Sequence, residues 1–182
     1  MSSSGRSPKA GVVAVSEEVS EEAEKLAEEI TAEWKVKPLP VGRATECGKA
    51  TACGKSCAEC WELEQVFAGK QRDALAAEVL LYQKAALSLL TAEYFVYFLP
   101  AFLTASLRAP LAMADLTESL VFHLTPAGGG NQLLALRLPL LSSAQRRLVK
   151  AFLELQFSIS SPEPGVVEKD LHEEAMERFD HL

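Results

Sequence analysis

The sequence predicts an all-α fold: a single helical bundle-like domain of about six helices, with peripheral acidic helices at its N- and C-terminal ends. Three observations support this prediction. Apolar residues recur at helical spacing in most segments, long alternation of apolar and polar residues is absent, and one central segment is apolar on every face. A helix that is apolar all round belongs in the middle of a bundle. The length of 182 residues suits one domain with tails.

Composition and pattern divide the chain into five parts. A Ser-rich tail, residues 1–15, is expected to be disordered, and residues 16–35 form an acidic helix with a narrow apolar stripe. Residues 36–56 read as an extended, proline-containing linker followed by a Cys-rich loop. The helical core domain is expected over residues 57–160, and a last acidic helix lies within residues 161–182.

The first half of the core domain carries three helix signals. A helix is expected from Ser56 to Ala68 because Gly69 then stops it. Residues 73–90 have the apolar spacing of one continuous helix. Thr91 is the expected N-cap of the central apolar helix, residues 92–107, in which Pro100 should introduce a kink.

The second half of the core domain is less uniform. Residues 115–124 predict a short helix, whereas residues 133–138 are apolar but too short to assign, and they suit an extended segment against the core. Ser142 and Gln145 have the spacing of a capping box. The helix that this box opens should turn three side chains inward: Leu148, Phe152 and Leu155.

Several stretches of the core resemble a known family. The stretch from Leu87 to Leu103, with its LLTAEYFVYFLPAFL pattern, is accompanied in order by residues 119–124 and residues 140–153, and is preceded by residues 60–69. Together they resemble an uncharacterised, mainly bacterial helical domain family over about residues 57–157. The resemblance implies the same domain and carries no established activity.

The four cysteines of the chain are the most unusual local feature. Cys47, Cys53, Cys57 and Cys60 fall within fourteen residues, and four thiolates complete a tetrahedral zinc shell or hold an iron–sulfur cluster. Structural zinc sites usually combine two short pairs, and here only Cys57 and Cys60 are separated by two residues. Three interpretations therefore stay open: a zinc site of these four cysteines, a redox pair at Cys57 and Cys60, or a loop without specific chemistry.

The net charge of −7 is unevenly distributed. Residues 1–35 carry a net −4 and residues 162–182 a net −5, whereas residues 36–161 carry +2. A near-neutral centre lacks the basic face that nucleic-acid binding needs, and acidic ends are repelled by anionic lipid. The fourteen uncharged residues 94–107 are too few to span a membrane, and residues 11–15 are too short for a signal sequence. The sequence therefore predicts a cytoplasmic protein without nucleic-acid or membrane partners.

No complete catalytic motif is present in the sequence. Residues 48–56 have the wrong glycine spacing for a phosphate loop, and residues 172–176 lack the second histidine of a zinc protease. His123 follows Phe122 on an apolar helix, where a histidine is more often a packing residue than a base. The favoured function is a non-catalytic interaction or scaffold protein that binds a partner through its acidic terminal helices. The alternatives are a zinc or thiol-redox protein and an unrecognised enzyme centred on His123.

Overall fold

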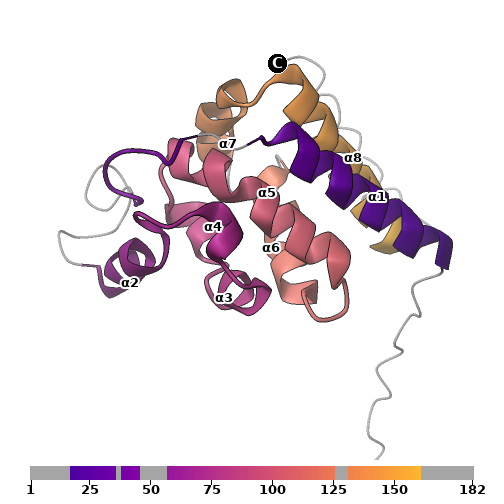
Figure 1. Cartoon of the computed structure of the whole chain (residues 1–182), viewed down its shortest axis with the longest axis horizontal. Helices are drawn as coiled ribbons and strands as arrows, with labels where there is room; N and C mark the ends of the chain where they lie inside the picture. The colour runs from indigo at the N-terminus through magenta and orange to yellow at the C-terminus, as the bar shows by residue number, and fades with distance from the viewer. Residues whose placement is uncertain (1–16, 36–37, 46–56, 126–130, 161–182) are drawn as a thin grey trace, which may run out of the picture.

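The computed structural model describes residues 17–35, 38–45, 57–125 and 131–160. Within these residues the protein has eight α-helices and no strand, which confirms the all-α prediction (Figure 1). The expected N-terminal tail and C-terminal acidic helix lie outside the described residues. The α-helices are, in chain order, α1 (Glu17–Glu33), α2 (Ala58–Phe67), α3 (Ala77–Tyr82), α4 (Ala86–Leu89), α5 (Ala92–Arg108), α6 (Ala114–Leu124), α7 (Asn131–Arg137) and α8 (Ser143–Ser160).

Helix α5 is the centre of the fold, as its apolar sequence predicts. It packs against α1, α3, α6 and α7, so little of its surface is left for water. The Thr91 hydroxyl caps its start by accepting a hydrogen bond from the Tyr94 amide at 3.4 Å, which confirms the predicted N-cap. Pro100 lies inside the helix, which continues to Arg108.

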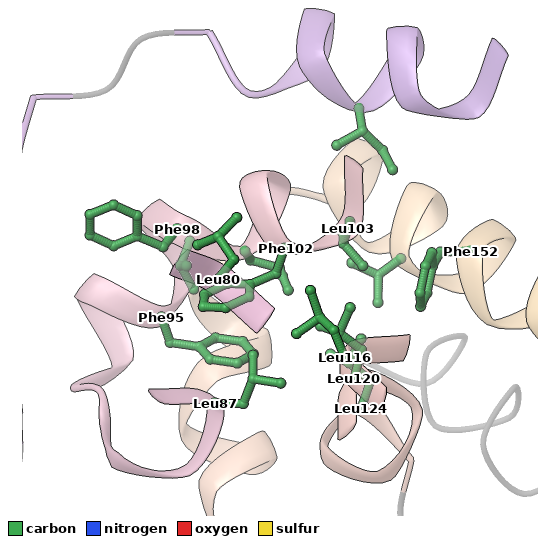
Figure 2. Close-up of a cluster of buried hydrophobic side chains, with 14 of the residues drawn as sticks. Leu80, Leu87, Phe95, Phe98, Phe102, Leu103, Leu116, Leu120, Leu124 and Phe152 are labelled. Carbon is green, nitrogen blue, oxygen red and sulfur yellow. The ribbon is translucent and has the colours of Figure 1, made fainter. Parts of the chain in front are cut away.

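The interior around α5 is filled by aromatic and leucine side chains. Phe98 lies edge-on to both Phe67 and Tyr97, with ring centroids 5.0 and 4.9 Å apart, a favourable arrangement for aromatic rings. The five aromatic side chains of α5 are all buried in the core: Tyr94, Phe95, Tyr97, Phe98 and Phe102. Figure 2 shows part of this interior, and the residues that it labels belong to α3, α4, α5, α6 and α8: Leu80, Leu87, Phe95, Phe98, Phe102, Leu103, Leu116, Leu120, Leu124 and Phe152.

Helix α1 lies at the edge of the bundle, and one side of it completes the core. It packs against α5 and α8, and its predicted apolar stripe is buried. Ala27 and Ile30 are fully inaccessible to solvent, and Trp34, just after the helix, is only 1% exposed. The acidic residues lie on the exposed side of the helix, and the narrow apolar stripe packs against α5 and α8.

The prediction of one continuous helix over residues 73–90 is wrong. The chain forms a 3₁₀ turn, η1 (Arg72–Ala74), and then the short helices α3 and α4. Backbone groups that a continuous helix would pair internally have distant partners here. The Thr91 amide donates to the Ala44 carbonyl at 2.8 Å, and Arg137 donates to the carbonyls of Leu87 and Leu90 at 2.6 and 2.9 Å. These tertiary hydrogen bonds end α4, whereas the turn between α3 and α4 is closed locally, by the Ala86 amide on the Gln83 carbonyl and the Leu87 amide on the Lys84 carbonyl.

The last described elements agree with their local signals in part. Residues 131–137 are helical, not extended as the sequence suggested, and a second 3₁₀ turn, η2 (Leu138–Leu140), leads to α8. The capping box is confirmed: the Gln145 amide donates to the Ser142 hydroxyl at 3.1 Å, and the Ser142 amide donates to the Gln145 side chain at 3.0 Å. None of the helices in the described part of the chain is long and apolar enough to cross a membrane.

Candidate functional site

Two of the four cysteines lie together at the start of α2. Cys57 is the N-cap residue and is half-buried, and Cys60 is the third residue of the helix and is buried. Cys47 and Cys53 lie outside the described residues. Among the residues that the structure does describe, no three His, Cys, Asp or Glu side chains are gathered as metal ligands. The zinc site of Cys47, Cys53, Cys57 and Cys60 therefore stays a prediction.

A groove of about 980 Å³ runs along the N-terminal end of α5. One wall is an extended segment, residues 38–45, which we call the strap (Figure 1). The other walls are the first turns of α5 and the α7–η2 connection. Three of its lining residues are large apolar side chains that are exposed to solvent: Val41, Leu136 and Leu140. Exposed apolar side chains around a concave surface are typical of ligand-binding or protein-binding surfaces.

The carboxylate of Glu64 on α2 fixes the strap. It accepts hydrogen bonds from the amides of Ala44 and Thr45 at 3.0 and 2.9 Å, and from the Thr45 hydroxyl at 2.8 Å. Arg43 adds an ion pair at 3.4 Å. Burial alone would raise the pKa of Glu64, but these hydrogen bonds outweigh it and lower the pKa below the ordinary value of 4.5. We call Glu64 and its partners in the strap the clasp.

Helix α5 holds the strap from its other side. The Tyr94 hydroxyl lies 3.0 Å from the Pro40 carbonyl and 3.2 Å from the Gly42 carbonyl, and it donates its proton to this pair. Burial raises the pKa of Tyr94, and the negative charge of Glu64 adds to the increase, so the hydroxyl keeps its proton. Gly42 has φ +107°, a backbone conformation that favours glycine. These polar groups of the groove hold its wall in place, which suits binding better than proton transfer.

His123 lies apart from the groove, on α6. It lines neither the groove nor a smaller cavity of about 240 Å³ between α1, α5 and α8. Burial lowers the pKa of His123, and the positive charge of Arg137 lowers it further, so the imidazole is neutral near pH 7. Its ring contacts Phe122 edge-on at 5.2 Å. This is the arrangement expected of a packing residue.

Arg137 is a buried charge that the sequence reasoning missed. Its side chain is 2% exposed and lies over the Phe95 ring, 4.1 Å from the centroid, while its nitrogens bind the carbonyls that end α4. A guanidinium over an aromatic face and at a helix C-terminus is well placed electrostatically. The signal that could have revealed it is a single arginine in the otherwise apolar stretch 133–141.

Helix α1 presents a row of carboxylates on the side opposite its buried stripe. We call this row the acidic face, and Lys25 is the one cation that lies among its carboxylates. Two further glutamates of α1 are engaged: Glu24 pairs with Arg108 at 3.1 Å, and Glu33 accepts a hydrogen bond from Ser142 at 3.4 Å. The acidic face consists of six exposed residues: Glu17, Glu18, Glu21, Glu22, Glu28 and Glu29.

Comparison with known families gives one result. Residues 60–171, well over half of the chain, match the model of a family of unknown function (DUF6714). The chain belongs to this family. The expected domain of unknown function is thus confirmed, over residues 60–171 rather than 57–157. No curated protein and no solved structure matches the chain significantly.

The DUF6714 region begins in the first turn of α2 and includes every later described helix. It therefore contains Glu64, Tyr94 and Arg137, whereas α1, the strap and Cys57 precede it. The groove is built from both parts, because the strap meets α5 and α7 there. Membership of DUF6714 supplies no activity, so any functional conclusion has to come from the surfaces themselves.

Proposed function

We propose that this protein is a non-catalytic interaction domain that binds a basic segment of a partner protein on the acidic face of α1. The observation that carries the proposal is the fixed geometry of this face. The opposite side of the helix is buried against α5 and α8, so packing fixes the helix with its six exposed glutamates on the solvent side. Rigid presentation lowers the entropy that a binding surface loses when its partner arrives.

The acidic face carries repulsion between like charges that Lys25 offsets only in part. Glu17 precedes Glu21, and Glu18 precedes Glu22, by four residues each, so like charges adjoin along the helix. Such pairs destabilise a helix by about 0.2–0.5 kcal/mol each. Lysine and arginine side chains of a partner would turn this repulsion into attraction and would also speed association at low salt.

The chemistry of the acidic face also argues for the type of partner. A row of carboxylates repels nucleic-acid phosphates and anionic lipid headgroups, which leaves a basic protein segment as the complementary surface. The role expected for the C-terminal acidic helix, within residues 161–182, and the cytoplasmic location both stay predictions. The two ends share the same sign of charge, so both would attract the same class of partner.

The proposal is tested with a synthetic twelve-residue peptide of alternating lysine and alanine as the probe. Binding to the full chain is followed by NMR, at two ionic strengths. We expect amide shifts concentrated on α1, and weaker binding at higher salt. Replacing Glu21, Glu22, Glu28 and Glu29 with glutamine should weaken binding about tenfold, because each exposed ion pair is worth about 0.2–1 kcal/mol.

The matched control removes the same number of charges elsewhere. Glu59, Glu78, Glu118 and Glu154 are exposed glutamates outside α1, and their replacement with glutamine makes the same change in net charge. If this control weakens peptide binding as much as the α1 variant, attraction is due to overall charge, and the proposal fails. Shifts spread evenly over the molecule would also contradict it.

A further inference from the structure

Cys57 and Cys60 occupy two particular positions in the first turn of α2. Cys57 is the N-cap residue, with extended backbone angles of φ −85° and ψ 121°, and its carbonyl accepts the first helical hydrogen bond, from the Trp61 amide, at 3.0 Å. Cys60 is the third residue of the helix and is 1% exposed, whereas Cys57 is half-buried. Both side chains are thiols in the structure. The first turn of α2 therefore holds a half-buried thiol, Cys57, and a buried thiol, Cys60.

This arrangement suits a disulfide between the two residues. The Cys57 side chain makes no capping hydrogen bond to α2, so turning it towards Cys60 by rotation about its Cα–Cβ bond breaks no cap. Helical residues three apart have Cβ atoms about 5–6 Å apart, and a disulfide needs a Cβ separation of about 3.5–4.5 Å. Because Cys57 is outside the helix proper, adjustment of this one residue closes the gap while α2 keeps its hydrogen bonds.

We propose that Cys57 and Cys60 form a reversible dithiol–disulfide site that reacts with small disulfides such as oxidised glutathione. The site is independent of partner binding on α1, because it lies on another helix, and it needs neither Cys47 nor Cys53. It also differs from the zinc prediction, which requires all four sulfurs. The nucleophile is Cys57, because its thiol is the more accessible of the two.

The reaction proceeds in two exchanges that balance. The Cys57 sulfur attacks one sulfur of oxidised glutathione; the glutathione S–S bond breaks, a mixed disulfide forms, and the departing glutathione thiolate takes up the proton lost by Cys57. The Cys60 sulfur then attacks the Cys57 sulfur of the mixed disulfide. The Cys57–Cys60 bond forms, and the second glutathione leaves with the proton of Cys60. Two protein thiols are oxidised, and one glutathione disulfide is reduced to two thiols.

The test uses the full chain, folded and treated with a chelator so that bound metal does not shield the thiols. A Cys47→Ser/Cys53→Ser variant retains only the proposed pair. After exposure to oxidised glutathione, mass spectrometry should show the loss of two hydrogens and no lasting adduct, with full reversal by dithiothreitol. Peptide mapping of the wild-type chain should place the disulfide between Cys57 and Cys60.

Two single variants in the same background assign the roles. With Cys60→Ser, Cys57 should keep a stable glutathione adduct, because no second thiol displaces it. With Cys57→Ser, the buried Cys60 should react with oxidised glutathione at least about tenfold more slowly than Cys57 does in the Cys60→Ser variant. The proposal is overturned if the pair stops at a mixed disulfide, if the two single variants react equally fast, or if wild-type mapping links either residue to Cys47 or Cys53. The reaction rates of the same thiols in the urea-unfolded chain show how fast they react with oxidised glutathione when the fold is absent.

Discussion

The two described segments that precede the DUF6714 region are attached to it by different forces. Helix α1 is attached by burial of its apolar stripe against α5 and α8, with Ile30 fully inaccessible. In the strap Ala44 and Thr45 are buried and Leu39 is partly buried, but Val41 is fully exposed, and hydrogen bonds to Glu64, Tyr94 and the Thr91 amide hold the segment. One attachment is non-directional and spread over many atoms, and the other depends on a few oriented groups.

Because of this difference, the two segments should respond differently to acid and to single substitutions. Apolar burial contributes roughly in proportion to area, and it does not depend on protonation. A clasp made by one carboxylate fails when that carboxylate is neutralised or removed, because several donors lose their acceptor together. The groove wall is therefore the part of the molecule that a single local change can release, while α1 and its acidic face stay in place.

The largest effect is expected from Ile30→Ala. Removing most of a fully buried side chain costs about 2–5 kcal/mol, from lost burial and from the cavity left behind. Urea unfolding monitored by circular dichroism measures the loss. Glu29→Ala, on the exposed side of the same helix, is the matched control and should change stability by no more than about 0.5 kcal/mol. A loss below about 1 kcal/mol for Ile30→Ala would show that α1 is not part of the core.

A smaller and more local effect is expected from Glu64→Gln. Glutamine preserves the shape but places an NH₂ group against donors in the strap, and bonds to a charged acceptor are worth about 1.5–3 kcal/mol. Hydrogen exchange should show faster exchange of the Ala44 and Thr45 amides, while amides inside α5 keep their protection. Glu59→Gln, on the same helix but exposed, is the control. Unchanged exchange at both strap amides would show that the clasp does not hold the strap.

Acidification should separate the two attachments. Because the pKa of Glu64 is lowered in the folded protein, its contribution is fully present above about pH 4.5 and is lost as the pH falls through the folded pKa. The stability difference between wild type and Glu64→Gln should therefore stay constant from about pH 7 to about pH 5 and shrink as the pH falls below about 4.5. The difference between wild type and Ile30→Ala should stay constant over the same range. Equal pH dependence of both differences would contradict the comparison.

The features that the sequence predicted correctly have their causes close together in the chain. The Thr91 N-cap, the Ser142 and Gln145 capping box and the all-round apolar character of α5 are each visible within a few residues. Such local signals act before any tertiary contact forms, which is why the bounds of α5 agree with the prediction within one residue.

The features that escaped prediction depend on partners far apart in sequence. Glu64 binds Thr45 across 19 positions, and Arg137 binds Leu87 across 50. The local sequence around Glu64 does not show which donors its carboxylate will meet, and the leucines before Arg137 do not show which carbonyls its guanidinium will bind. The end of α4 belongs to the same class, because the Thr91 amide donates to Ala44 and the Leu87 and Leu90 carbonyls accept from Arg137. The groove could not be predicted, since it requires the strap to be placed first.

The smallest effect is expected from Tyr94→Phe. The ring keeps its place in the core, and only the hydroxyl that bonds the Pro40 and Gly42 carbonyls is lost, so destabilisation of about 0.5–1.5 kcal/mol follows. Exchange at Thr45 should rise less than in Glu64→Gln, because the clasp remains. Tyr82→Phe removes a hydroxyl from a side chain that is 78% exposed, and it should leave stability and exchange unchanged. If Tyr94→Phe instead releases the strap as completely as Glu64→Gln, the two sides of the strap act as one cooperative unit, and the attachment is not the sum of separate hydrogen bonds.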